Sequence, residues 1–217
     1  MNDARQNASR LLKDAEVLLE AERYPSALAM AILSIEESGK TIVLRDLSTA
    51  VDANDVKRVW KEYRSHTKKN ILWVFPDLIA RGVRTDSLYS TLFDPASDHP
   101  AVLDALKQVA IYTDCLGNRH WSKPLEVVSR ELAASIVKVA KLFVRHEQYS
   151  VEQLELWVQY IGPARKQGSA LAIKNAFLAW DQEVMRRGWE QDSKERQFLR
   201  QALMEIGANG TSPGRVF

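Results

Sequence analysis

His66 lies in a run of cations that could carry acid–base chemistry. Arg64 and Lys69 are close to it in the sequence. An imidazole that titrates near neutral pH, beside fixed positive charges, has the composition needed for general acid–base catalysis on a phosphodiester. The alternative is a satisfied core histidine, the usual role of a lone histidine on a largely apolar helix face. His66 is therefore a candidate base, and Arg64 and Lys69 are candidate phosphate ligands.

The segment around His66 is also the strongest basic run in the chain. Lys57 to Asn70 holds six Lys or Arg and one Glu, in a chain whose net charge is only +2. Such a run attracts a phosphate-rich partner in a salt-dependent manner, or it is simply a solvated helix face. Lys61 and Asn70 are the candidate substrate-binding residues here.

A second charged cluster interrupts the most apolar segment of the sequence. From Pro25 to Leu44 the charged residues are Glu36, Glu37 and Lys40. A helix that is apolar nearly all round lies inside a bundle, where a carboxylate has to be paired or hydrogen-bonded. Glu36 and Lys40 are one turn apart and could pair. The cluster is either a structural ion pair or exposed helix edge, or part of a site with Glu37 contacting substrate.

A third group of polar residues follows an apolar helix. Tyr112 and Asp114 precede a polar turn at 117–124, and loops of this kind often carry functional residues. Both are candidate substrate-binding residues, although Asp114 could instead cap a helix or form an ion pair. Arg119 and His120 form another cation–imidazole pair in that turn, but adjacent turn residues usually point in different directions.

Several chemistries have no support in the sequence. No histidine follows a glutamate at the three-residue spacing of helical dimetal sites, and one cysteine cannot supply a zinc site of the usual spacing. Neither a phosphate-binding Gly-x-x-x-x-Gly-Lys loop nor a Gly-x-Ser-x-Gly elbow is present. We expect no metal and no cofactor.

The elements that must position these residues are predicted to be helices. Apolar residues recur at three- and four-residue spacing, which is the helical pattern. On the third helix the apolar stripe continues into His66, Thr67 and Asn70, which places polar groups on a core-facing surface. The predicted helices cover about 3–22, 25–47, 55–76, 99–116, 125–148, 151–161, 165–187 and 192–206.

The predicted organisation is an all-α bundle over 1–148, additional C-terminal helices over 149–207 and a frayed tail over 208–217. A single cysteine and an amino terminus without an apolar signal segment predict the reducing cytoplasm. No uninterrupted apolar stretch approaches about 18 residues, so no membrane span is expected.

Three segments together resemble the AbiV family of bacterial abortive-infection proteins, within the HEPN helical superfamily. They are 27–44, with Ile-Glu-Glu-Ser-Gly-Lys at 35–40, then 60–69, and 111–124. The resemblance spans roughly residues 5–145. It implies a HEPN-type helical bundle, usually a homodimer, that acts in phage defence or in toxin-like arrest of the host.

The resemblance also implies a possible activity, because many HEPN proteins are metal-independent ribonucleases with an Arg-x(4–6)-His motif. In this chain Lys61 has the four-residue interval before His66. Arg58 is separated from His66 by seven residues and Arg64 by one. A lysine supplies charge to a phosphate but not the bidentate guanidinium fork.

Three hypotheses follow. In the first, an antiphage effector cleaves RNA: His66 acts as base on a ribose 2′-hydroxyl, and Arg64 and Lys69 hold the phosphate. Glu36 with Lys40 orients the reacting group. In the second, a non-catalytic, toxin-like binding protein blocks the translation machinery or a phage protein. In the third, the chain is a structural bundle with no role in defence.

Overall fold

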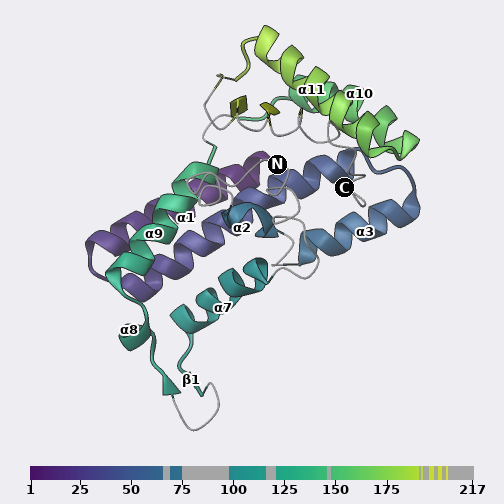
Figure 1. Ribbon diagram of the computed structural model, residues 1–217. Coiled ribbons are helices and arrows are strands. Elements are labelled where there is room, and N and C mark those ends of the chain that lie inside the picture. The colour runs from purple at the N-terminus through teal and green to yellow at the C-terminus, as the bar shows by residue number, and fades with distance from the viewer. Residues whose placement is uncertain are drawn as a thin grey trace.

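The computed structural model describes residues 1–65, 69–74, 98–115, 121–145, 148–190, 192, 196–197, 200–201 and 204. Within these ranges the chain is helical apart from one short hairpin, which confirms the predicted all-α class (Figure 1). None of the described helices combines the length and the apolar character that crossing a bilayer requires.

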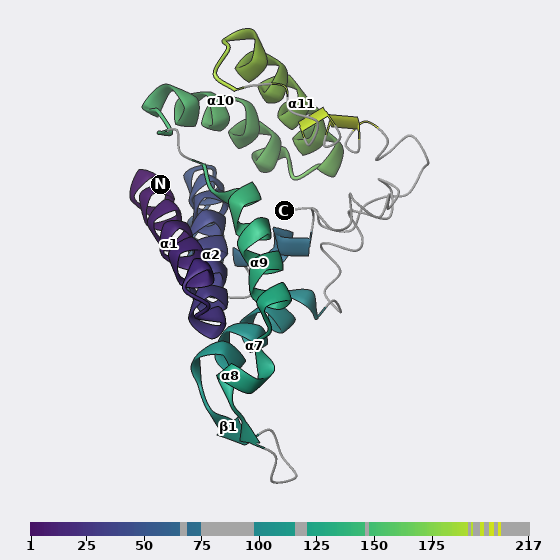
Figure 2. The ribbon, with the colours of Figure 1, turned by 90° about the vertical axis from the view of Figure 1, so that its left-hand side faces the viewer.

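Three long helices form the main body. α1 (Asn2–Glu20) and α2 (Tyr24–Ser48) pack along each other, and α9 (Arg130–Phe143) runs alongside and packs against both (Figures 1 and 2). Pro25 lies in the first turn of α2 as predicted, where its missing N–H leaves no helical bond unmade. The buried residues are mostly small on α1 and α2, which allows close packing; they include Ala8, Ala15, Ala27, Leu28, Ala31 and Ile32.

α3 (Ala53–Arg64) is shorter than predicted. Asp52 caps its start, because the Asp52 carboxylate accepts hydrogen bonds from the main-chain N–H groups of Asn54 and Asp55, both at 2.8 Å. The helix ends at Arg64, and Ser65 is extended, so the prediction of one helix continuing to Pro76 was wrong. A 3-10 turn, η1 (Ile71–Val74), follows.

The apolar stripe predicted on α3 does not face the core as a whole. Val59 is fully buried, whereas Trp60 is 46% exposed and Val56 44% exposed. α3 ends at Arg64, so Asn70 does not continue its helical face, although the Asn70 side chain is fully buried. The predicted placement of His66 and Thr67 on that face lies outside the described residues.

α7 (His99–Ile111) leads into a two-stranded antiparallel hairpin, β1 (Asp114–Cys115) and β2 (Trp121–Ser122). The predicted helix 99–116 ends early because Tyr112 is already extended. A single turn, α8 (Pro124–Val127), precedes α9, so the predicted continuous helix 125–148 is interrupted. Ser129 marks the restart, since its hydroxyl accepts the N–H of Leu132 at 3.2 Å.

The C-terminal helices have a core of their own. α10 (Val151–Gln167) begins with the predicted capping box between Ser150 and Gln153, and α11 (Ala170–Arg186) packs against it. α10 continues through Pro163, so its predicted end near Ile161 and the predicted start of the next helix at Arg165 were wrong. The buried residues are Leu156, Trp157, Ile161, Trp180 and Val184. Little of the predicted 192–206 helix and none of the 208–217 tail is described, and the boundary at 148 stays a prediction.

Two aromatic side chains hold these helices together. The rings of Trp157 on α10 and Trp180 on α11 meet edge to face, with centroids 5.0 Å apart and planes at 89°. The Arg45 guanidinium of α2 lies 4.6 Å from the Trp157 ring centroid, so the pair also contacts the main body.

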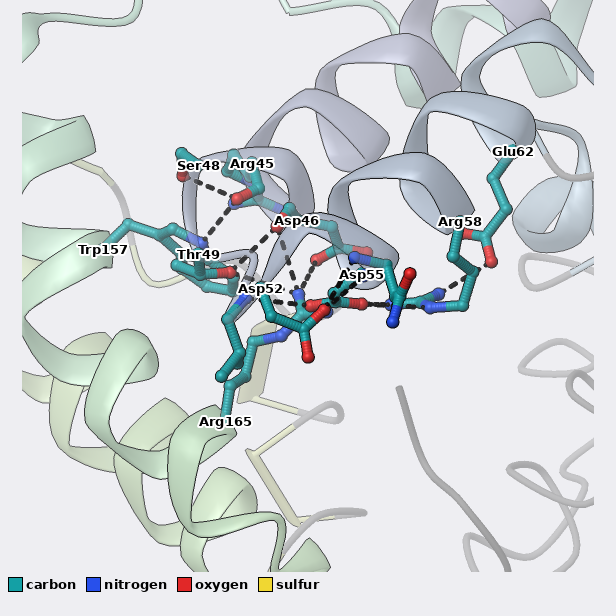
Figure 3. A network of polar contacts seen from close by, with 12 residues as sticks. Arg45, Asp46, Ser48, Thr49, Asp52, Asp55, Arg58, Glu62, Trp157 and Arg165 are labelled. Carbon is teal, nitrogen blue, oxygen red and sulfur yellow. Dashed lines mark hydrogen bonds and ion pairs between the residues drawn. The ribbon is translucent and has the colours of Figure 1, made fainter.

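A polar network fixes α10 on the corner between α2 and α3 (Figure 3). The Arg165 side chain is only 7% exposed. It donates to the Asp46 carbonyl at 3.3 Å, to the Thr49 hydroxyl at 3.1 Å and to the Asp55 carboxylate at 3.4 Å. Elsewhere Asn2 exchanges two hydrogen bonds with the main chain of Tyr149, at 2.8 and 3.1 Å. These contacts, together with that of Arg45 on Trp157, attach the C-terminal helices to the main body.

Candidate functional site

A buried charged cluster lies where α2, the segment after α3 and α7 meet. It consists of Glu36, Glu37, Lys40, Lys69 and Lys107, with Asp104 at its edge. Its centre is an ion pair across helices, between the Lys107 Nζ and the Glu36 Oε1 at 2.5 Å. Glu36 is 3% exposed and Lys107 5%. Because both charges are removed from water, each depends on the other for stabilisation.

Lys107 has a second carboxylate partner in Asp104, one turn before it on α7, at 2.8 Å. Burial by itself lowers the pKa of Lys107, but hydrogen bonds to Asp104 and Glu36 outweigh burial and raise the pKa above that of an ordinary lysine. Lys107 is therefore held firmly in its charged form.

The predicted pair between Glu36 and Lys40 is not the one formed. Lys40 contacts Glu37 instead, one turn earlier on the same helix. The reason is tertiary: Lys107 approaches Glu36 from α7 on the buried side, while Glu37 and Lys40 lie on the flank of α2 and stay partly exposed. Lys40 also lies over the ring of Tyr63 on α3, 5.9 Å from its centroid.

Gly39 lets the segment after α3 reach the cluster. A Cβ atom at this position would lie 2.1 Å from the main-chain oxygen of Lys69, closer than any such contact can be. Only glycine permits this approach, in which the main chain of a neighbouring segment rests directly on α2. Gly39 therefore sets the position of Lys69 and of the residues that follow it.

Lys69 enters the cluster almost completely buried, at 9% exposure. Burial lowers the pKa of Lys69, and the nearby cations Lys40 and Lys107 lower it further, against the opposing effect of Glu36 and Glu37. Lys69 therefore releases its proton more readily than an ordinary lysine.

Asn70 is the most unusual polar residue in this region. Its side chain is fully buried, and among the described residues neither its amide nitrogen nor its amide oxygen has a hydrogen-bond partner. Burying an amide in this way costs about 1–3 kcal/mol of folding free energy. The segment is held against α2 despite this cost.

The remaining sequence candidates lie elsewhere. Lys61 and Arg64 are exposed on α3. Tyr112 is 58% exposed at the end of α7, and none of the described contacts of the cluster involves it. Asp114 belongs to β1, but its side chain lies outside the described part of the chain, as does His66.

The sequence interpretation missed Lys107. A usable signal was present, because Lys107 lies four residues after Leu103 and three before Ala110, on the face that α7 buries. Among the described residues, no three His, Cys, Asp or Glu side chains gather as a metal ion would require.

Comparison with known families gives one match. The family model for AbiV, a HEPN-type family, matches residues 1–145, which is more than half of the chain. The match covers the helices from α1 to α9 and the whole buried charged cluster, and it ends before α10. Comparison with curated proteins and with solved structures finds no match. The chain belongs to the AbiV family of HEPN proteins, a family of abortive-infection defence.

Proposed function

We propose that this AbiV protein is an antiphage effector that cleaves RNA without a metal ion. The observation that carries the proposal is the convergence of charged side chains from three separate segments. Glu36 and Lys40 come from α2, Lys69 from the segment after α3, and Lys107 from α7. A cluster of cations supported by carboxylates, next to a histidine in sequence, has the composition for phosphodiester chemistry.

In the proposed reaction His66 takes the proton of a ribose 2′-hydroxyl, and the 2′-oxygen bonds to the adjacent phosphorus. The bond to the 5′-oxygen breaks, which leaves a 2′,3′-cyclic phosphate and a 5′-hydroxyl. Arg64 and Lys69 hold the phosphate, and the lowered pKa of Lys69 suits it to protonate the leaving oxygen. Glu36 and Lys40 are positioning residues that act through their partners Lys107 and Glu37.

The remaining sequence candidates are assigned to substrate contact. We propose that Lys61 and Asn70 contact the RNA near the phosphate, with Glu37 beside them. Tyr112 and Asp114, at the hairpin end of α7, would contact the RNA farther along the strand. By analogy with other HEPN proteins, the protein is proposed to act as a homodimer.

The test is RNA integrity after adding purified protein to a cell extract, with and without EDTA. We expect wild-type protein to cleave RNA in EDTA and to leave cyclic phosphate ends. His66→Ala and Lys69→Met should each slow cleavage by about a hundredfold or more. Lys138→Met, an exposed lysine on α9, is the matched control and should leave the rate unchanged. Cleavage that survives His66→Ala, or that requires a divalent ion, would refute the proposal.

The burial of the cluster favours a second candidate function, a non-catalytic, toxin-like protein that blocks the translation machinery or a phage protein by binding. Lys69 and Asn70 are buried, and Lys107 already neutralises Glu36, so a macromolecule has little access to them in this conformation. Stable capture of a ribosomal or phage protein by wild-type protein, with cellular RNA intact, would favour this alternative.

A further inference from the structure

α3 carries an exposed aromatic pair. The ring of Trp60 stacks on Tyr63, with centroids 5.1 Å apart and planes only 9° from parallel, yet Trp60 is 46% exposed. Val56, one turn before Trp60, is exposed as well. A large aromatic side chain that is stacked on a neighbouring ring and still exposes much of its surface to water is typical of a binding surface.

A row of cations runs beside this pair. Lys57, Lys61 and Arg64 are all exposed, and at 100° per residue they occupy the strip of α3 next to Trp60. No carboxylate in the described part of the chain pairs with any of them. We call this surface the Trp60 face; it comprises Val56, Lys57, Trp60, Lys61, Tyr63 and Arg64.

The acidic residues of α3 are engaged on its other flank. Asp55 bonds to Arg58 and to Arg165, and Glu62 bonds to Arg58 at 2.8 Å (Figure 3). One flank of the helix therefore carries the paired acids, and the flank beside Trp60 carries the exposed cations. This division leaves an unbalanced positive surface that a polyanion complements.

The Trp60 face is continuous with the buried charged cluster. Tyr63, the inner ring of the stack, contacts Lys40, and Lys40 pairs with Glu37. α3 itself lies beside α2 and away from α1 and α9 (Figure 1). A chain lying along this face would therefore lead toward the cluster.

We propose that the Trp60 face binds single-stranded RNA, with one base stacked on Trp60 and the phosphates contacting Lys57, Lys61 and Arg64. Stacking needs an unpaired base, so the face selects single strands over duplexes, and it tolerates any base because every base has a flat surface. The identity of the polyanion as RNA rests on the proposed function. The stacked rings and the exposed cations are observations that do not depend on the proposed function.

The experiment measures binding of a labelled oligouridine of about 12 nucleotides to the full-length protein by fluorescence anisotropy. Its sugars carry 2′-fluoro groups, so cleavage cannot occur and affinity is read separately from chemistry. We expect Trp60→Leu to weaken binding about tenfold or more and Trp60→Phe to weaken it less. Val17→Ala is the control, because Val17 is an apolar side chain that is 65% exposed on α1, away from the proposed RNA contacts, and it should bind as wild type does.

Charge is tested separately. Changing both Lys57 and Lys61 to Gln should weaken binding and reduce the slope of log affinity against log salt by about 1.4, since each phosphate contact to a single strand contributes about 0.7. A duplex of the same length should bind more weakly than the single strand. Unchanged affinity in Trp60→Leu would overturn the proposal. If Trp60→Leu keeps its affinity for RNA but loses a dimer in light scattering, the Trp60 face is instead a contact between two copies of the chain.

The two proposals can fail separately. Tight, Trp60-dependent binding without cleavage of ordinary RNA would support the proposed role of the Trp60 face and refute the ribonuclease proposal. Cleavage that is insensitive to Trp60→Leu would support the ribonuclease proposal and refute the role of the Trp60 face.

Discussion

Lys107 holds a charge that the interior cannot otherwise accommodate. Its partner Glu36 is a carboxylate at 3% exposure, and removing the cation leaves that carboxylate buried and unbalanced. We therefore expect Lys107→Met to reduce the free energy of unfolding by about 3–5 kcal/mol, measured by urea denaturation. The double variant Glu36→Gln with Lys107→Met should recover much of the loss, because neither charge remains.

The control for this prediction is another lysine–glutamate pair. Lys123 and Glu126 are 2.9 Å apart, but their side chains are 60% and 63% exposed. Lys123→Met should change stability by less than about 1 kcal/mol, since an exposed pair gains little over hydrated charges. Equal losses in Lys107→Met and Lys123→Met would show that burial does not govern the Glu36 pair.

The choice of partners within the cluster was beyond local sequence reasoning. The spacing of Glu36 and Lys40 is compatible with an ion pair, and so is that of Glu37 and Lys40, which is the pair formed. The partner of Glu36 is determined by Lys107, which is 71 residues away in sequence and is brought to Glu36 by the packing of α7 on α2. Periodicity identifies the polar positions on a helix but not the neighbour that another helix supplies.

The contact between α2 and the segment 69–74 depends on the absence of a side chain at Gly39. Gly39→Ala would place a methyl group 2.1 Å from the Lys69 oxygen, so the main chain of that segment has to move. We expect a loss of about 1–3 kcal/mol in the free energy of unfolding and faster amide hydrogen exchange at 69–74. RNA cleavage should fall with it, because Lys69 is displaced.

Gly162→Ala is the matched control on α10. Its nearest neighbour would be a Val158 methyl group at 3.9 Å, an ordinary contact, and alanine favours a helix over glycine. This variant should be as stable as wild type or more stable by up to about 1 kcal/mol. If Gly39→Ala and Gly162→Ala change the free energy of unfolding equally, then a steric clash with Lys69 is not the reason that position 39 needs glycine.

Helices with strong local signals were well predicted, and the others were not. α1 and α2 begin and end within a few residues of prediction, because apolar periodicity and Pro25 mark them. α3 stops at Arg64 without a nearby glycine or proline, and the close approach of Lys69 to Gly39 is a tertiary contact that local sequence signals do not carry. α10 passes through Pro163, where its continuation carries Arg165 to the corner of α2 and α3.

Arg165 makes a large share of the polar contacts that attach the C-terminal helices to the AbiV region. Its guanidinium is the only described side chain that bonds to Asp46, Thr49 and Asp55 together. Arg165→Gln should lower stability by about 2–3 kcal/mol, because hydrogen bonds to a buried charged group are lost. Hydrogen exchange should increase across α10 and at the start of α3, and remain unchanged in α1.

Arg186→Gln serves as the comparison. Arg186 is paired with Glu183 on α11, but its side chain is 71% exposed. Removing it should leave the exchange of α10 and α3 as in wild type. Increased exchange in both variants would mean that α10 responds to any loss of positive charge, and not to the Arg165 network.

The edge-to-face contact of Trp157 and Trp180 gives the molecule an optical signature of its own. Two indole rings fixed 5.0 Å apart couple their electronic transitions, and a fixed asymmetric arrangement of coupled transitions contributes a paired positive and negative band to circular dichroism. That contribution vanishes when α10 and α11 separate, even if both remain helical. Packing of the C-terminal pair can therefore be followed during heating or ligand addition without attaching any label.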